Sequence, residues 1–144
     1  YFYLFMDNLN AKSDHIQNVA KKIENYYSKQ KYERFAMGDM AGKTSYLLNK
    51  KLFQLEGLTS GSKIIEYIKK EENLCKVLLD LDIEVYLASK IQTYNNAIYV
   101  EEPSIKSDNA KKMSGYLKIK PTKIFKSENI KIYAFEIKSK NDCI

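Results

Sequence analysis

The chain has 144 residues, of which 44% are hydrophobic and 29% charged, and its formal net charge is +6. This composition excludes a largely disordered chain, and the length fits one domain, residues 1–144, around a single core. No run approaches the ~18 apolar residues of a membrane-spanning helix, and two cysteines, Cys75 and Cys143, do not make a disulfide framework. We therefore expect a cytoplasmic protein without a membrane partner.

The first half of the sequence predicts mainly helices. The aromatic run 1–6 predicts an opening strand, and 32–37 predicts a second short strand. Apolar residues at helical spacing, preceded by polar residues that can cap, predict helices over 15–30, 41–55 and about 60–72. The segment 73–81 fits a short buried helix and a strand equally well.

From Ile83 onward the pattern changes to alternation, which predicts strands over 83–87 and 97–100 with a turn at Asn95-Asn96. A polar loop is expected over 103–114. A last hairpin is expected over 116–138, kinked at Pro121 and turning at 127–129. Strands that follow a helical half predict an α+β fold, with the N-terminal helical half packed on a mostly antiparallel sheet formed largely by the C-terminal half.

The charge is distributed unevenly along the chain. Residues 1–105 contain 14 basic and 14 acidic side chains, whereas residues 106–144 contain 10 lysines and 4 acids, so the whole net charge belongs to the second segment. The basic hairpin, 106–140, therefore predicts an electropositive face. The candidate anion-binding residues are Lys111, Lys112, Lys118, Lys120, Lys123, Lys126 and Lys131. The competing interpretation is an edge hairpin kept soluble by its lysines.

We expect a non-enzymatic binding domain whose partner is a nucleic-acid backbone or an acidic protein surface. With one arginine, Arg34, the chain is poorly equipped for reading guanine edges in DNA. Aromatic residues in or beside the basic half could stack on bases or belong to the core: Tyr94, Tyr99, Tyr116, Phe125, Tyr133 and Phe135. A second class is a small inhibitor, immunity or accessory protein of a defence, counter-defence or mobile-element system, acting by protein–protein contact.

Two short motifs resemble known enzyme families. The segment Gly38 to Thr44 resembles the phosphate-binding loop of P-loop NTPases, but three residues instead of four separate its glycines, and Asp39 would place a carboxylate in the anion cradle. Glu136-Ile137-Lys138 resembles the Glu-x-Lys element of PD-(D/E)xK nucleases, in which the carboxylate holds Mg²⁺. That family also needs an acid on the preceding strand, which is absent here.

A metal-dependent nuclease built on Glu136 and Lys138 is thus an alternative, and the competing interpretation pairs Glu136 with Lys118 or Lys120 across the hairpin. His15, the only histidine, is expected to be solvated or to cap a helix. One histidine and two separated cysteines make a zinc site improbable, so we expect no cofactor.

Overall fold

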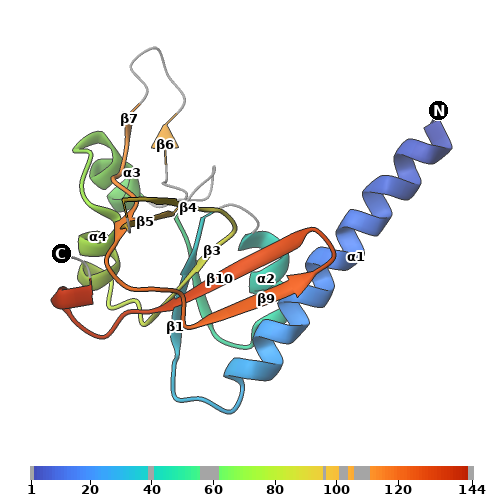
Figure 1. The fold of residues 1–144 in the computed structure, drawn as a ribbon, viewed down its shortest axis with the longest axis horizontal. Helices are drawn as coiled ribbons and strands as arrows, with labels where there is room; N and C mark the ends of the chain where they lie inside the picture. Colours follow the sequence, from blue (N-terminus) through green and yellow to red (C-terminus); the bar gives the residue numbers. More distant parts are fainter. Residues whose placement is uncertain are drawn as a thin grey trace.

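The computed structural model describes residues 2–38, 41–55, 62–95, 97–100, 104–105 and 111–142, without the side chains of 2–11, 42–43, 104–105 and Lys112 (Figure 1). The described helices are α1 (Phe2–Tyr27), α2 (Ala41–Leu47), α3 (Ser62–Lys69), α4 (Leu74–Asp80) and the 3-10 helix η1 (Lys140–Asp142). The described strands are β1 (Arg34–Met37), β2 (Lys51–Gln54), β3 (Val85–Ala88), β4 (Ile91–Tyr94), β5 (Ala97–Val100), β6 (Ser104–Ile105), β7 (Lys111–Lys112), β8 (Tyr116–Leu117), β9 (Lys123–Ser127) and β10 (Ile130–Glu136).

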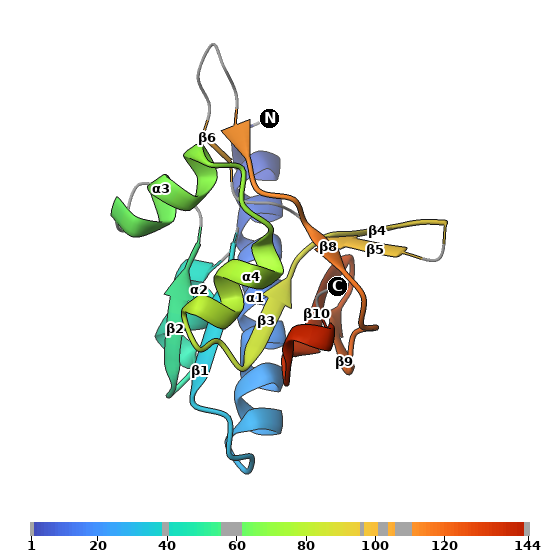
Figure 2. The same ribbon diagram turned by 90° about the vertical axis from the view of Figure 1, so that its left-hand side faces the viewer.

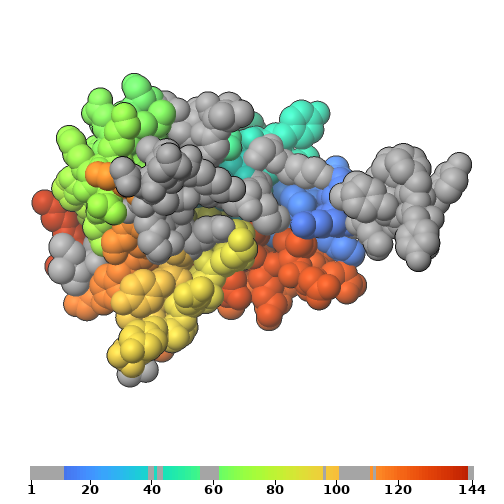
Figure 3. Space-filling view, turned by 90° about the horizontal axis from the view of Figure 1, so that it is seen from above, coloured from blue at the N-terminus to red at the C-terminus, as the bar shows by residue number. Residues whose placement is uncertain are grey.

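The main sheet has the strand order β2-β1-β3-β10-β9, with β2 and β9 at its edges. β1 runs parallel to β2 and β3, while β10 is antiparallel to both β3 and β9. A second sheet, β4-β5-β8, and the pair β6-β7 are antiparallel. The β4–β5 hairpin projects from the body of the molecule (Figures 2 and 3). The expected α+β fold is confirmed.

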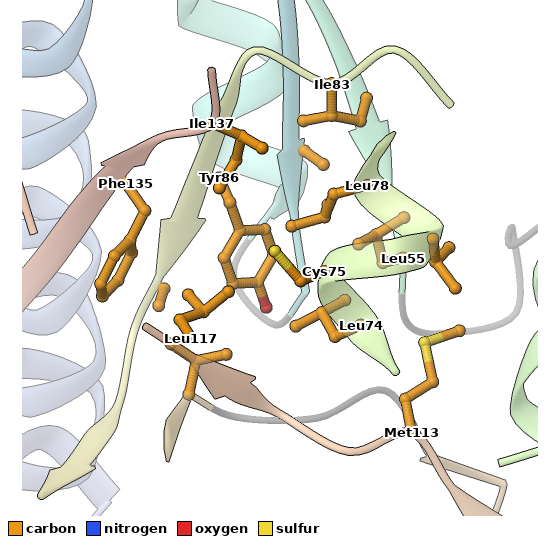
Figure 4. Packing of buried hydrophobic residues seen from close by; sticks show 14 of the residues in the cluster. Leu55, Leu74, Cys75, Leu78, Ile83, Tyr86, Met113, Leu117, Phe135 and Ile137 are labelled. Atoms are coloured by element: carbon orange, nitrogen blue, oxygen red, sulfur yellow. The ribbon is translucent and has the colours of Figure 1, made fainter. Parts of the chain in front are cut away.

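Helices cover both faces of the main sheet, and each face buries its own core (Figure 2). On one face, Val19, Ile23 and Tyr27 of α1 pack against Val85 and Leu87 of the sheet and their neighbours. On the other face, residues of α3, α4 and the second sheet surround Tyr86 and Ala88, the two residues of β3 that point to this side (Figure 4). Because both faces of β3 are covered, all four of its residues are buried, as expected for a central strand between two layers.

The opening strand predicted over 1–6 is wrong, because α1 begins at Phe2 and continues to Tyr27. No glycine or proline separates the aromatic run from the amphipathic helix that follows it. A helix already nucleated and packed downstream extends at little further cost in entropy, which accounts for the difference. Among the helices described here, none combines the length and the apolar character needed to cross a membrane.

The helix predicted over 41–55 is also wrong in its second half, because the chain turns after α2 and residues 51–54 form β2 beside β1. Tertiary pairing thus overrides the local helical preference. The ambiguous segment 73–81 is the helix α4, whose first turn is capped by Asn73: its Oδ1 accepts hydrogen bonds from Cys75 N at 2.9 Å and Lys76 N at 3.3 Å.

The boundaries of the last hairpin also differ from the prediction. Tyr116 and Leu117 form β8, which pairs with β5, and the terminal hairpin consists of β9 and β10 alone. The polar loop expected over 103–114 contains the short pair β6-β7, while 103 and 106–110 lie outside the described residues. Glu128, with φ of 49°, occupies the left-handed region in the turn between β9 and β10.

Cys75 is fully buried in the core that α4 helps to form, and its sulfur is disulfide-bonded. The expectation of a chain whose cysteines form no disulfide framework is therefore wrong for Cys75. Cys143, the other cysteine of the chain, lies outside the described residues.

Candidate anion-binding surface

The terminal hairpin places two lysines directly opposite each other. In the register of β9 and β10, Lys126 is the partner of Lys131, and both side chains are exposed. Their neighbours Phe125 and Ile132, also opposite each other, are buried against α1. Because successive side chains of a strand alternate between faces, the two lysines lie on the hairpin face that α1 does not cover.

The edge of the hairpin adds two further cations. Lys22 of α1 donates a hydrogen bond from Nζ to the Lys126 carbonyl oxygen at 2.6 Å. The Lys123 Nζ lies 5.3 Å from the ring centroid of Tyr26, in a cation–π contact. We refer to Lys22, Lys123, Lys126 and Lys131 as the hairpin cluster.

A groove of about 530 Å³ runs between α1 and the edge strand β9. Its lining residues are Lys22, Asn25, Tyr26, Lys123, Ile124, Phe125 and Lys126. Three lysines line it without a carboxylate among these residues, so an anionic group entering the groove would meet cations together with an aromatic and an apolar wall.

In the part of the chain that the structure describes, no carboxylate forms an ion pair with a lysine of the hairpin cluster. Other lysines are paired: Lys50 Nζ lies 3.0 Å from Glu33 Oε1, and Lys76 Nζ lies 3.2 Å from Glu72 Oε2.

Three of the seven predicted lysines lie on the terminal hairpin: by alternation Lys123 is on the same face as Phe125, toward α1, and Lys126 and Lys131 are on the opposite face. Lys111 lies beside α3, where its Nζ donates to the Lys69 carbonyl at 3.0 Å. Lys118 and Lys120 lie in the link between β8 and β9, both exposed, and the side chain of Lys112 lies outside the described residues. Sequence reasoning missed Lys22, because only the packing of α1 against β9 brings it to the hairpin, 104 residues away.

Comparison of the chain with family models, with curated proteins and with solved structures found no match. The function must therefore be argued from geometry.

The predicted pairing of Glu136 with Lys118 or Lys120 is wrong, because Glu136 of β10 lies opposite Val85 of β3. Its Oε2 accepts a 2.8 Å hydrogen bond from the Tyr32 hydroxyl and lies 3.8 Å from Lys138 Nζ. Burial, followed by this hydrogen bond and the charge of Glu136, raises the pKa of Tyr32 to about 12.

The Glu-x-Lys element is therefore engaged in local contacts. A search of the described residues finds no group of three or more histidine, cysteine or acidic side chains placed to hold a metal ion. For the P-loop-like segment, Asp39 and Met40 lie outside the described residues.

His15 is neither at a helix start nor solely solvated. It lies in the middle of α1, and its Nδ1 is 3.1 Å from Ser127 Oγ of β9. His15 thus helps to hold α1 against the terminal hairpin, in line with the neighbouring contact from Lys22 to the same strand.

Proposed function

We propose that this chain is a non-enzymatic anion-binding domain and that the hairpin cluster is its binding surface. The observation that carries the proposal is the pair of exposed lysines, Lys126 and Lys131, opposite each other with no carboxylate partner among the described residues. Like charges in directly opposed positions destabilise a sheet. A bound anion between or beside them would convert that repulsion into attraction.

The position of Lys22 and Lys123 supports binding over a purely solubilising role. Lysines that protect an edge strand need only point into water. Here Lys22 and Lys123 instead line a groove with Tyr26, so that charge and an apolar wall are presented together. Lysine acts as a point charge, which suits phosphate or carboxylate groups at variable positions more than a fixed bidentate geometry.

A salt titration with charge-neutral variants tests the proposal. The full chain is titrated against heparin, a DNA duplex and poly-L-glutamate at several salt concentrations, as the wild type, as Lys126→Gln and as Lys131→Gln. We expect each variant to weaken binding. On the duplex, each should also reduce the slope of log affinity against log salt by about 0.9 for every phosphate that the missing ammonium group no longer neutralises.

Lys76→Gln is the matched control, because it removes the same charge from a lysine that is already paired with Glu72 and Asp80. It should leave affinity nearly unchanged. Equal effects of Lys126→Gln and Lys76→Gln would mean that net charge alone governs binding. An absence of binding to all three polyanions at low salt would refute the proposed function.

The cytoplasmic location stays a prediction, and one observation weighs against it. Cys75 is disulfide-bonded, and disulfides persist in oxidising compartments but are rare in the cytosol. An inhibitor or accessory role by protein–protein contact would use the same hairpin cluster on an acidic protein surface, so binding to poly-L-glutamate in preference to DNA would favour it. Metal-dependent nuclease activity through Glu136 would require cleavage of DNA or RNA with Mg²⁺ that is abolished in Glu136→Ala.

A further inference from the structure

Three tyrosines share one face of the second sheet. In the registers of β4, β5 and β8, Gln92 lies opposite Tyr99, and Tyr99 lies opposite Tyr116. Tyr94, two residues after Gln92, falls on this same face by alternation. The rings of Tyr99 and Tyr116 are 5.7 Å apart between centroids and tilted by 58°.

The opposite face of the same sheet is apolar and covers the core. Val100 and Leu117 are buried there, and Ile91 and Ile98 pack against the same cluster (Figure 4 labels Leu117). The tyrosine face is accordingly the outward one. Tyr94 is 67% exposed and Tyr99 is 36% exposed, although rings of this size are ordinarily buried more fully. We refer to Tyr94, Tyr99 and Tyr116 as the tyrosine face.

Both edge strands of the second sheet connect to the main sheet at or next to the terminal hairpin. β4 begins three residues after Ala88, which pairs with Tyr133 of β10, and β8 is joined to β9 by the link 118–122. In Figures 2 and 3 the β4–β5 hairpin, yellow, begins close to the β9–β10 hairpin, and its tip projects away from it. The link between the two surfaces carries the exposed side chains of Lys118 and Lys120.

We infer that the tyrosine face and the hairpin cluster together bind single-stranded nucleic acid, an inference that rests on the proposed function. Of the two partner classes that the hairpin cluster fits, a nucleic acid offers planar rings as well as negative charge. Single strands expose those rings, because their bases are unpaired and can stack on aromatic side chains of a sheet. A single strand supplies such a ring at every nucleotide, whereas a protein surface supplies ring partners only at particular positions.

In this arrangement the phosphates follow the lysines and successive bases lie on Tyr94 and Tyr99. Recognition by stacking tolerates any base sequence, which agrees with a chain that has one arginine and thus little means of reading base edges. The tyrosines contribute affinity that does not depend on salt, whereas the lysines contribute the part that does.

The test measures the fluorescence anisotropy of a labelled 12-nucleotide oligothymidylate with the full chain at several salt concentrations. Tyr94→Ala and Tyr99→Ala should each weaken binding about tenfold, the effect of removing one stacked base, with the salt slope unchanged. Lys126→Gln should instead reduce the slope by about 0.7. Tyr99→Phe keeps the ring and should keep the affinity.

Tyr46→Ala is the matched control, since Tyr46 on α2 is 89% exposed and belongs to neither surface. Wild-type affinity for the oligonucleotide in both Tyr94→Ala and Tyr99→Ala would overturn the inference. Tighter binding of heparin or poly-L-glutamate than of the oligonucleotide would also overturn it. If that binding depended on the lysines, the proposed function would still stand. Failure to bind any polyanion would remove both.

Discussion

Replacing Lys131 by glutamate should stabilise the fold while it weakens anion binding. The change converts the opposed pair of Lys126 and Lys131 into a pair of opposite charges on the same exposed face of the hairpin. Charges about 6 Å apart in water interact by about 0.7 kcal/mol. Removing a repulsion and adding an attraction of that order, reduced by side-chain entropy, gives a gain of about 1 kcal/mol in the free energy of unfolding.

That gain translates into a measurable shift of the melting temperature. An unfolding entropy of about 2.1 cal/mol/K per residue gives about 300 cal/mol/K for this chain, so 1 kcal/mol corresponds to about 3 °C. Melting curves followed by circular dichroism at 10 mM and 1 M NaCl measure it. The shift should nearly disappear at 1 M, where the screening length falls to about 3 Å.

Two variants separate the pairwise effect from the change in net charge. Lys131→Gln removes the repulsion without adding an attraction and should show about half of the shift. Lys29→Glu changes the net charge equally at an exposed position just after α1 and should shift the melting temperature less. A melting temperature of Lys131→Glu at or below that of the wild type at low salt would refute the reasoning about the opposed pair.

Four further predictions concern the stability of the fold. The buried Tyr27 hydroxyl has no hydrogen-bond partner among the described residues, so Tyr27→Phe should leave the free energy of unfolding in urea unchanged or raise it by about 1 kcal/mol. Tyr32→Phe should instead lower it by about 1 kcal/mol, because it removes the hydrogen bond to Glu136. Because the pKa of Tyr32 is raised to about 12 in the folded chain, the unfolded chain releases this proton first, near pH 10. The free energy of unfolding should therefore fall between pH 10 and 12, and it should fall less steeply in Tyr32→Phe. Asn73→Ala should cost about 1 kcal/mol in the same urea assay, and an unchanged midpoint would contradict the cap at α4. Reduction should lower the stability by about 2–4 kcal/mol, and alkylation before reduction should leave Cys75 unlabelled in mass spectra.

The local sequence pattern correctly predicted the elements whose tertiary contacts favour the same secondary structure. β1, β3, β5 and α3 lie close to where alternation or helical spacing placed them, because their apolar residues meet a core, on one face of β5 and α3 and on both faces of β1 and β3. The residues 51–54 carry no such signal, and their state depends on a parallel partner, β1, that the local sequence does not reveal.

Of the candidate surface, only the lysines of the terminal hairpin could be predicted from the sequence. The pattern around residues 123–131 shows where the turn falls and thus which lysines oppose each other. It does not show that Tyr116 pairs with Tyr99 of a different strand, because alternation identifies a strand but not its partner. The arrival of Lys22 at β9 depends on a packing of α1 that no short window of sequence contains.

The hydrogen bond from Lys22 to the Lys126 carbonyl has a consequence for self-association. β9 ends the main sheet, and an uncapped strand there would be a template on which a second molecule could continue the sheet toward fibrils. An ammonium group already occupying a main-chain acceptor denies an incoming strand one of the bonds it needs. The same side chain that lines the groove thereby makes growth of the sheet at this edge less favourable.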